Sequence, residues 1–161
     1  MGKGRIKLLV MDVDGTLTDG KIYMGNDGEM MKAFNIKDGC GIHDILIPAG
    51  IIPVIITGRK SKIVKNRCME IGITEYYQGV FDKTAILQEI LDEKGFGLGN
   101  VAYIGDDIND ISCMQFVKSE GGLIGCPADA VESVKSIADF IAHSNGGNGA
   151  VREFIDYLSH S

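Results

Sequence analysis

Short apolar runs alternate with amphipathic stretches along most of the chain. Residues 6–13, 51–56 and 101–104 are apolar runs typical of buried parallel strands, and small, polar or acidic residues follow each of them. Weaker strands are expected near residues 76–77 and 122–125. Helical spacing or end signals occur over residues 38–49, 60–71, 84–94, 109–117, 130–136 and 151–158. This alternation predicts an α/β fold, a Rossmann-like doubly wound parallel sheet.

Two segments depart from the alternation. Residues 17–36 contain the turn sequence Y-M-G-N-D-G between short apolar stretches, which predicts a β-hairpin insertion. Residues 143–149 read H-S-N-G-G-N-G and begin a Gly-rich C-terminal tail, about residues 143–161. With 161 residues and no internal repeat, the chain is expected to form one domain over residues 1–161.

Composition narrows the class of protein. A hydrophobic content of 45% excludes a disordered chain, and a net charge of -6 argues against nucleic acid or an anionic membrane as partner. The four cysteines form no CxxC pair, so we expect buried free thiols in a reducing cytoplasm. The first apolar run is broken at Asp12, too early for a signal peptide or a membrane span. We therefore expect a soluble, cytoplasmic protein.

Polar residues collect where three of the predicted strands end. Asp12 and Asp14 follow the first strand, Thr57 follows the second, and Asp106 follows the fourth. Ligands of open α/β sheets bind at the carboxyl ends of the strands, so these residues are expected to share one crevice. Lys83 precedes a helix that follows another strand.

These residue types suit phosphoryl transfer. Carboxylate oxygens are hard ligands that favour Mg²⁺, and a lysine and a threonine suit the oxygens of a phosphate group. Taken singly, Thr57 is compatible with a loop hydroxyl, Lys83 with a solvated helix start and Asp107 with a helix N-cap. The whole set in this order favours a catalytic site over those structural explanations.

The motifs resemble those of the haloacid dehalogenase superfamily of aspartate-nucleophile phosphotransferases. D-V-D-G-T at residues 12–16 resembles its first motif, Thr57 the second, Lys83 the third, and G-D-D-I-N-D at residues 105–110 the fourth. The segments between motifs are too short for a cap domain, which needs about 50 residues or more. The resemblance therefore implies the haloacid dehalogenase core without a cap.

A closer resemblance covers nearly the whole chain. TDGKIYMGNDGEMMKAFNIKDGCGI, ITGRKSKIVKNRC and GGNGAVREF are similar to a small cap-less, tetrameric subgroup of sugar-acid phosphatases. Thr16 stands where many members of this subgroup have Val. The resemblance implies hydrolysis of 3-deoxy-D-manno-octulosonate 8-phosphate in lipopolysaccharide biosynthesis. It also implies a homotetramer packed through the hairpin, with the Gly-rich tail reaching a neighbour's active site.

The resemblance also implies residue roles. Asp12 is the expected nucleophile, Asp14 the general acid and base, and Lys83 a third catalytic group that contacts the phosphate. Mg²⁺ is expected on Asp12, Asp106 and the backbone carbonyl of Asp14, with Asp107 and Asp110 in support. The residues expected to bind substrate are Thr57 and Gly58 for the phosphate, Arg59 and Lys60 for the sugar carboxylate, and Gly147 and Arg152 from the tail.

Two other functions remain open at this point. A phosphatase for a nine-carbon sialic-type sugar-acid phosphate has the same chemistry, although Arg59 resembles the octulosonate group. A non-catalytic regulatory subunit is the alternative of a different class. It is disfavoured because Asp14, the acid/base position, is retained.

Overall fold

A six-stranded parallel sheet forms the centre of the protein, with strand order β5-β4-β1-β6-β7-β8. The computed structural model describes residues 4–160, so the two ends of the expected single domain lie outside the described residues. The chain builds one half of the sheet outward from β1 and then returns to build the other half. This is the predicted doubly wound order, and it puts a switch point beside β1. The strands are β1 Leu8–Met11, β4 Ile52–Ile56, β5 Glu75–Tyr77, β6 Val101–Ile104, β7 Leu123–Cys126 and β8 Phe140–Ile141.

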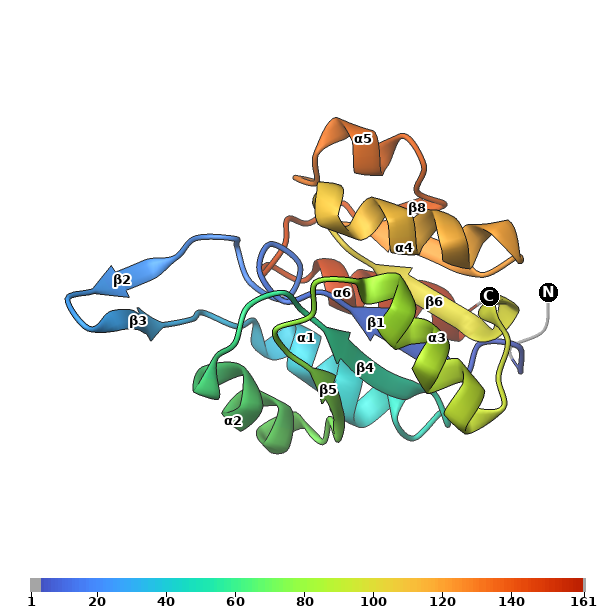
Figure 1. Ribbon diagram of the computed structural model, residues 1–161, viewed down its shortest axis with the longest axis horizontal. Helices are drawn as coiled ribbons and strands as arrows, with labels where there is room; N and C mark the ends of the chain where they lie inside the picture. Colours follow the sequence, from blue (N-terminus) through green and yellow to red (C-terminus); the bar gives the residue numbers. More distant parts are fainter. Residues whose placement is uncertain (1–3, 161) are drawn as a thin grey trace.

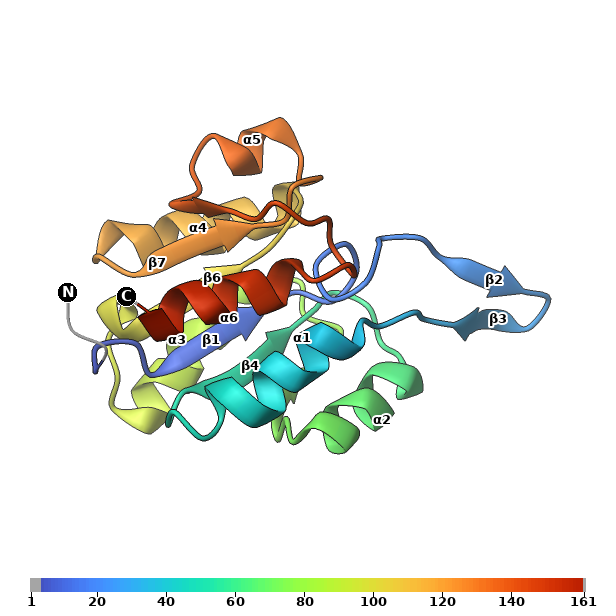
Figure 2. The same cartoon turned by 180° about the vertical axis from the view of Figure 1, so that it is seen from behind.

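Helices cover both faces of the sheet. Figures 1 and 2 show α3 and α4 on one face and α1 and α6 on the other. None of the helices within residues 4–160 has the length and apolar character needed to cross a membrane. The helices are α1 Ile36–Cys40, the π-helix η1 Gly41–Leu46, α2 Lys62–Ile71, α3 Lys83–Lys94, the short 3-10 helix η2 Leu98–Asn100, α4 Ile108–Ser119, α5 Glu132–Lys135 and α6 Ala150–His160.

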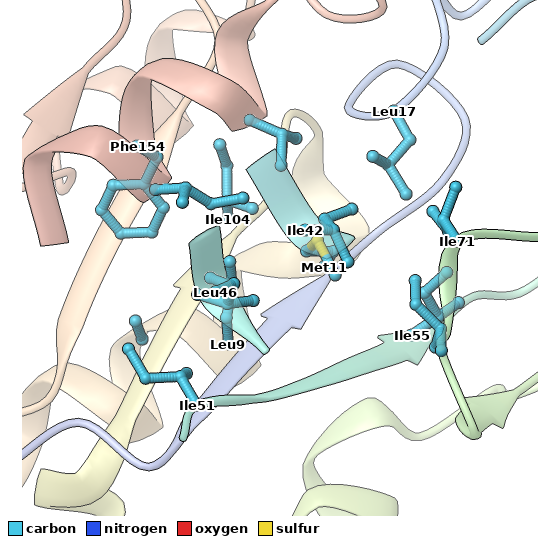
Figure 3. Close-up of a cluster of buried hydrophobic side chains, with 14 of the residues drawn as sticks. Leu9, Met11, Leu17, Ile42, Leu46, Ile51, Ile55, Ile71, Ile104 and Phe154 are labelled. Carbon is cyan, nitrogen blue, oxygen red and sulfur yellow. The ribbon is translucent and has the colours of Figure 1, made fainter. Parts of the chain in front are cut away.

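The central strand shows why the apolar runs are nearly continuous. Leu9 and Met11 of β1 belong to one buried cluster, whereas Leu8 and Val10 belong to a second cluster. Successive side chains of a strand point to opposite faces, so a strand covered on both faces needs apolar residues at every position. Figure 3 shows the first cluster, in which Phe154 of α6 packs with side chains of the sheet and of η1.

The predicted hairpin is present and projects beyond the body of the protein (Figures 1 and 2). Its strands, β2 Tyr23–Gly25 and β3 Gly28–Met31, pair antiparallel around an Asn-Asp turn. The paired part is shorter than the expected segment 17–36, because the residues on either side connect the hairpin to the body. Large apolar side chains on the hairpin are exposed, namely Ile22, Met24, Met30 and Met31.

The helix expected over residues 151–158 is present as α6 Ala150–His160, within the segment described as a Gly-rich tail. Its residues Val151, Phe154 and Ile155 are fully buried, so this part of the tail belongs to the core. The short strand β8 was not predicted. Two residues carry too little periodicity to mark a strand, and β8 forms because its backbone pairs with β7.

Candidate active site

The ends of β1, β4 and β6 meet at one open cavity of about 360 Å³. Asp12, Thr57 and Asp106 line it, each coming from the carboxyl end of one of these strands. The strands are neighbours in the sheet, and the backbone N–H of Asp12 donates to the carbonyl of Ile104 at 3.2 Å. The predicted convergence of the strand ends is therefore present. The remaining lining residues are Asp14, Gly20, Gly58, Arg59, Asp107, Ile108 and Asn109.

Lys83 joins two buried carboxylates at the base of the site. Its Nζ lies 3.1 Å from Oδ1 of Asp12 and 2.8 Å from Oδ1 of Asp110. All three residues are buried. Burial alone would lower the pKa of Lys83, but the charges of the two carboxylates outweigh it and raise that pKa. Lys83 is therefore a charged group beside Asp12.

Both carboxylate oxygens of Asp110 accept hydrogen bonds from several donors. Its Oδ1 also accepts from the hydroxyl of Tyr103 at 2.7 Å, and its Oδ2 accepts from the backbone N–H groups of Asp106 and Asp107 at 3.0 and 3.3 Å. Asp107 caps α4, as its side chain accepts from the N–H of Ile108 at 2.7 Å. Asp110 thus holds Lys83 and the loop after β6, and Asp107 holds the start of α4.

The acid cluster fits a magnesium ion. Carboxylate oxygens of Asp12, Asp106 and Asp110 all lie within 4.8 Å of one another. Burial and repulsion from neighbouring carboxylates raise the pKa values of Asp12 and Asp106, and a cation between them relieves that repulsion. Because donors already occupy Asp110, the oxygens of Asp12 and Asp106 are the ones left for a hard cation. Asp106 is steadied by Thr16, whose hydroxyl donates to Oδ1 at 3.2 Å.

Asp14 lies at the mouth of the cavity with its side chain 20% exposed. Its Oδ1 accepts from Lys32 Nζ at 2.6 Å, and its Oδ2 lies 3.9 Å from Nε of Arg59. The sequence motifs assign no role to Lys32. It lies just after β3, and nothing in its spacing from the motifs connects a hairpin residue to the strand ends.

The loop after β4 positions Thr57, Gly58 and Arg59 at the cavity. The N–H of Thr57 donates to the carbonyl of Tyr77 at 3.0 Å. Thr57 does not stand at a helix N-terminus, because α2 begins at Lys62 with Ser61 as its N-cap. Lys60 does not line this cavity. Its aliphatic stem passes over Gly79, where any side chain would overlap it.

The two expected substrate-binding residues near the C-terminus lie apart from each other. Gly147 packs on the loop after β1, where its N–H donates to the carbonyl of Thr16 at 3.1 Å. Arg152 lines a different cavity, and its guanidinium lies 3.1 Å from Asp156. Within this chain the Gly-rich stretch therefore supports the loop that follows Asp12 and Asp14, and Arg152 does not join their cavity.

Comparison with known proteins identifies relatives over nearly the whole chain. Residues 70–155 match the model of the haloacid dehalogenase-like hydrolases. The chain is 46% identical over 153 residues to 3-deoxy-D-manno-octulosonate 8-phosphate phosphatase of Salmonella typhi, covering 95% of this chain and 79% of that protein.

Solved structures agree with that relationship. One is the phosphatase of the same name from Moraxella catarrhalis, in complex with magnesium ion, phosphate ion and a KDO molecule. It matches with TM-score 0.89 and 39% identity over 97% of this chain and 87% of that one. The cobalt-bound deoxy-D-mannose-octulosonate 8-phosphate phosphatase of Haemophilus influenzae matches with TM-score 0.90 and 33% identity, over 98% and 90% of the two chains.

The doubly wound sheet and the acids at its strand ends define a hydrolase of the haloacid dehalogenase-like class, and the chain belongs to that family. Within it, the chain belongs with the 3-deoxy-D-manno-octulosonate 8-phosphate phosphatases, since it is 46% identical to the one from Salmonella typhi. Residues 4–160 hold the core of this class with no separate cap domain, as the spacing of the motifs indicated.

Proposed function

We propose that this protein is a Mg²⁺-dependent phosphatase that hydrolyses 3-deoxy-D-manno-octulosonate 8-phosphate through an aspartyl-phosphate. The observation that carries the proposal is the contact of Lys83 with Asp12 at 3.1 Å, beside Asp106 at the ends of neighbouring strands. We infer the identity of the substrate from the relatives, which are named for this reaction. The product is a sugar acid of lipopolysaccharide biosynthesis, and the four free cysteines support a reducing, cytoplasmic location.

In the first step, a carboxylate oxygen of Asp12 attacks phosphorus and the bond from phosphorus to the sugar oxygen breaks. Asp14 gives its proton to the departing sugar oxygen. Lys83 neutralises charge on Asp12 and the phosphate, and Thr57 and Gly58 orient the phosphate oxygens. Mg²⁺ held by Asp12, Asp106 and the carbonyl of Asp14 supplies further positive charge to this anionic centre.

In the second step, water attacks the phosphorus of the aspartyl-phosphate and the bond to Asp12 breaks. Asp14, now ionised, accepts the proton of that water, and inorganic phosphate leaves. Asp14 lines the same cavity as Asp12 but is more exposed, which suits a group that exchanges protons with both a leaving group and water.

Arg59 is the residue proposed to bind the carboxylate of the sugar acid. It lines the cavity next to Gly58, and half of its side chain is exposed, so its guanidinium is available to a substrate carboxylate. Loss of this contact in Arg59→Ala should lower kcat/KM by about 10- to 100-fold. None of Lys60, Gly147 and Arg152 lines this cavity. Their contacts with the substrate are therefore proposed from the family resemblance alone.

The hairpin is the proposed contact surface of a homotetramer. Met24 and Met30 are 61% and 71% exposed on a two-stranded unit that stands off the body. Such a hairpin is marginally stable alone, and exposed apolar side chains favour association. Light scattering should give a tetramer for the wild type and smaller species for a Met24→Lys, Met30→Lys variant. A monomeric wild type would refute the proposed tetramer but would not contradict the proposed reaction.

Phosphate release tests the reaction itself. The purified protein should release phosphate from 3-deoxy-D-manno-octulosonate 8-phosphate with Mg²⁺, and Asp12→Asn should release none. A nine-carbon sugar-acid 9-phosphate is the matched comparison. A higher kcat/KM for the nine-carbon compound would overturn the proposed substrate, and full activity of Asp12→Asn would overturn the mechanism.

A further inference from the structure

Lys32 connects the hairpin to the acid at the mouth of the cavity. Its Nζ lies 2.6 Å from Oδ1 of Asp14 and 2.9 Å from Oε2 of Glu29, and its side chain is only 2% exposed. An ammonium group this deeply buried depends on its partners, because an uncompensated buried charge is strongly unfavourable. The position of Lys32 is therefore coupled to the position of the Asp14 carboxylate.

Glu29 extends the contact to the loop after β4. Its Oε1 accepts from the hydroxyl of Ser61 at 3.0 Å, and its Oε2 lies 3.5 Å from Nη2 of Arg59. Burial opposes ionisation of Glu29, but hydrogen bonds from Lys32 and Ser61 and the charges of Lys32 and Arg59 outweigh it and lower the Glu29 pKa. Since Arg59 also lies 3.9 Å from Asp14, the four charged side chains form a closed ring.

We propose that Lys32 is a positioning residue for Asp14, so that the base of the hairpin is part of the active site. Lys32 does not line the cavity, so it acts on the substrate through Asp14. A partly exposed Asp side chain has several staggered rotamers available, and a strong ion pair selects one. A proton is transferred efficiently only from a correctly placed group, so loss of Lys32 should impair that step.

This inference rests on the proposed function and makes a selective prediction. The acid matters for a sugar alkoxide, which is a poor leaving group, and little for p-nitrophenolate, which departs without a proton. In Lys32→Met, kcat/KM for the sugar phosphate should fall by about 10- to 100-fold, the scale of misplaced catalytic groups. The kcat/KM for p-nitrophenyl phosphate, which reports the step up to departure of the leaving group, should stay within about threefold. Lys21→Met, at an exposed lysine of the same segment, is the matched control and should behave as wild type.

A double-mutant cycle separates positioning from direct contact with substrate. In an Asp14→Asn background, Lys32→Met should change kcat/KM by less than about twofold, because its effect passes through Asp14. Glu29→Gln should also lower kcat/KM for the sugar phosphate selectively, but by a smaller factor. This variant therefore tests the proposal if Lys32→Met folds poorly. The proposal is overturned by equal losses on both substrates, by a full further loss in the Asp14→Asn background, or by wild-type values for both variants. Failure of the wild type on both phosphates would instead refute the proposed function.

Discussion

The ammonium group of Lys83 lies 3.1 Å from the carboxylate of Asp12, and only one other carboxylate, that of Asp110, forms an ion pair with it in the described structure. Asp110 in turn accepts from Tyr103 and from two backbone N–H groups of the loop after β6. This chain of contacts begins at the fully buried side chain of Tyr103 and ends at Asp12. A change at either end should therefore alter both stability and chemistry.

Lys83→Met should lower both activity and stability. It leaves Asp12 and Asp110 buried without their cation, which typically lowers the free energy of unfolding by about 3–5 kcal/mol. Turnover should fall by about 10²-fold or more, because the positive charge beside the phosphate is lost. Lys94→Met is the control on the same helix. Its partner Glu75 is more exposed, so that change should cost about 1 kcal/mol or less. Urea unfolding and phosphate release measure the two effects, and an active Lys83→Met would contradict the assignment.

Mg²⁺ should stabilise the protein as well as activate it. An ion bound only by the folded state raises the free energy of unfolding by about 2.7 kcal/mol at 100 times its Kd. The Tm of the wild type should therefore rise with Mg²⁺, and that of Asp106→Asn should respond little. Asp27→Asn, at an exposed acid in the hairpin turn, should respond as wild type does.

EDTA should abolish turnover, and Ca²⁺ should bind without restoring it, because its looser coordination misplaces Asp12. If Mg²⁺ raised the Tm of wild type and Asp106→Asn equally, the ion would not be bound by Asp106.

The sequence predicted the sheet and the meeting of polar residues at its strand ends, for identifiable reasons. Each strand beside β1 is covered on both faces, so its apolar run is nearly continuous and visible without any tertiary information. Asp12 and Thr57 follow such runs directly and Asp106 follows one after Gly105, so parallel topology alone brings them together.

Contacts made by long side chains across the fold could not be predicted in this way. Lys32 reaches Asp14 from the hairpin, 18 positions away, and Arg152 turns to Asp156 rather than to the cavity. Asp38 accepts from the backbone of Arg152, 114 positions away, because α1 packs against α6. No local periodicity encodes these pairs, since they depend on how the layers pack.

Asp38 should make stability depend on pH. Asp38 belongs to α1 and is buried beside the start of α6, where its Oδ1 accepts from the N–H of Arg152 at 2.9 Å and its Oδ2 has no hydrogen-bond partner. Burial raises its pKa to about 6, against opposing hydrogen bonds from Arg152 and Gly149 and the charges of Arg67 and Arg152. Because the folded pKa lies above the unfolded value of 3.8, the contribution of Asp38 is fully present below pH 3.8 and is lost as pH rises through about 6.

Asp38→Asn removes this ionisation and keeps the shape of the side chain. Relative to wild type, its free energy of unfolding should rise by up to about 3 kcal/mol between pH 4 and pH 7, since one pKa unit corresponds to about 1.4 kcal/mol. Urea unfolding of both proteins across this range measures the difference. A difference that stays constant with pH, or that falls as pH rises, would contradict the assignment.

Gly146 packs directly against the backbone of the loop after β1. A Cβ at this position would overlap the carbonyl oxygen of Gly15 and lie 2.6 Å from its carbonyl carbon. These are backbone atoms of the loop that carries Asp12 and Asp14 into the site, so they cannot rotate away as a side chain would. Gly146→Ala must therefore displace either the Gly-rich stretch or the loop, and overpacking of this kind typically costs about 1–3 kcal/mol.

Displacement of the loop should also lower kcat, because it moves Asp14 relative to Asp12. Gly97→Ala is the matched control, since its Cβ would meet only Asn100 at 3.9 Å and its φ of -103° is open to any residue. Thermal unfolding and phosphate release should separate the two variants, with Gly97→Ala close to wild type in both. A Gly146→Ala protein with unchanged Tm and turnover would mean that the Gly-rich stretch does not support the loop after β1.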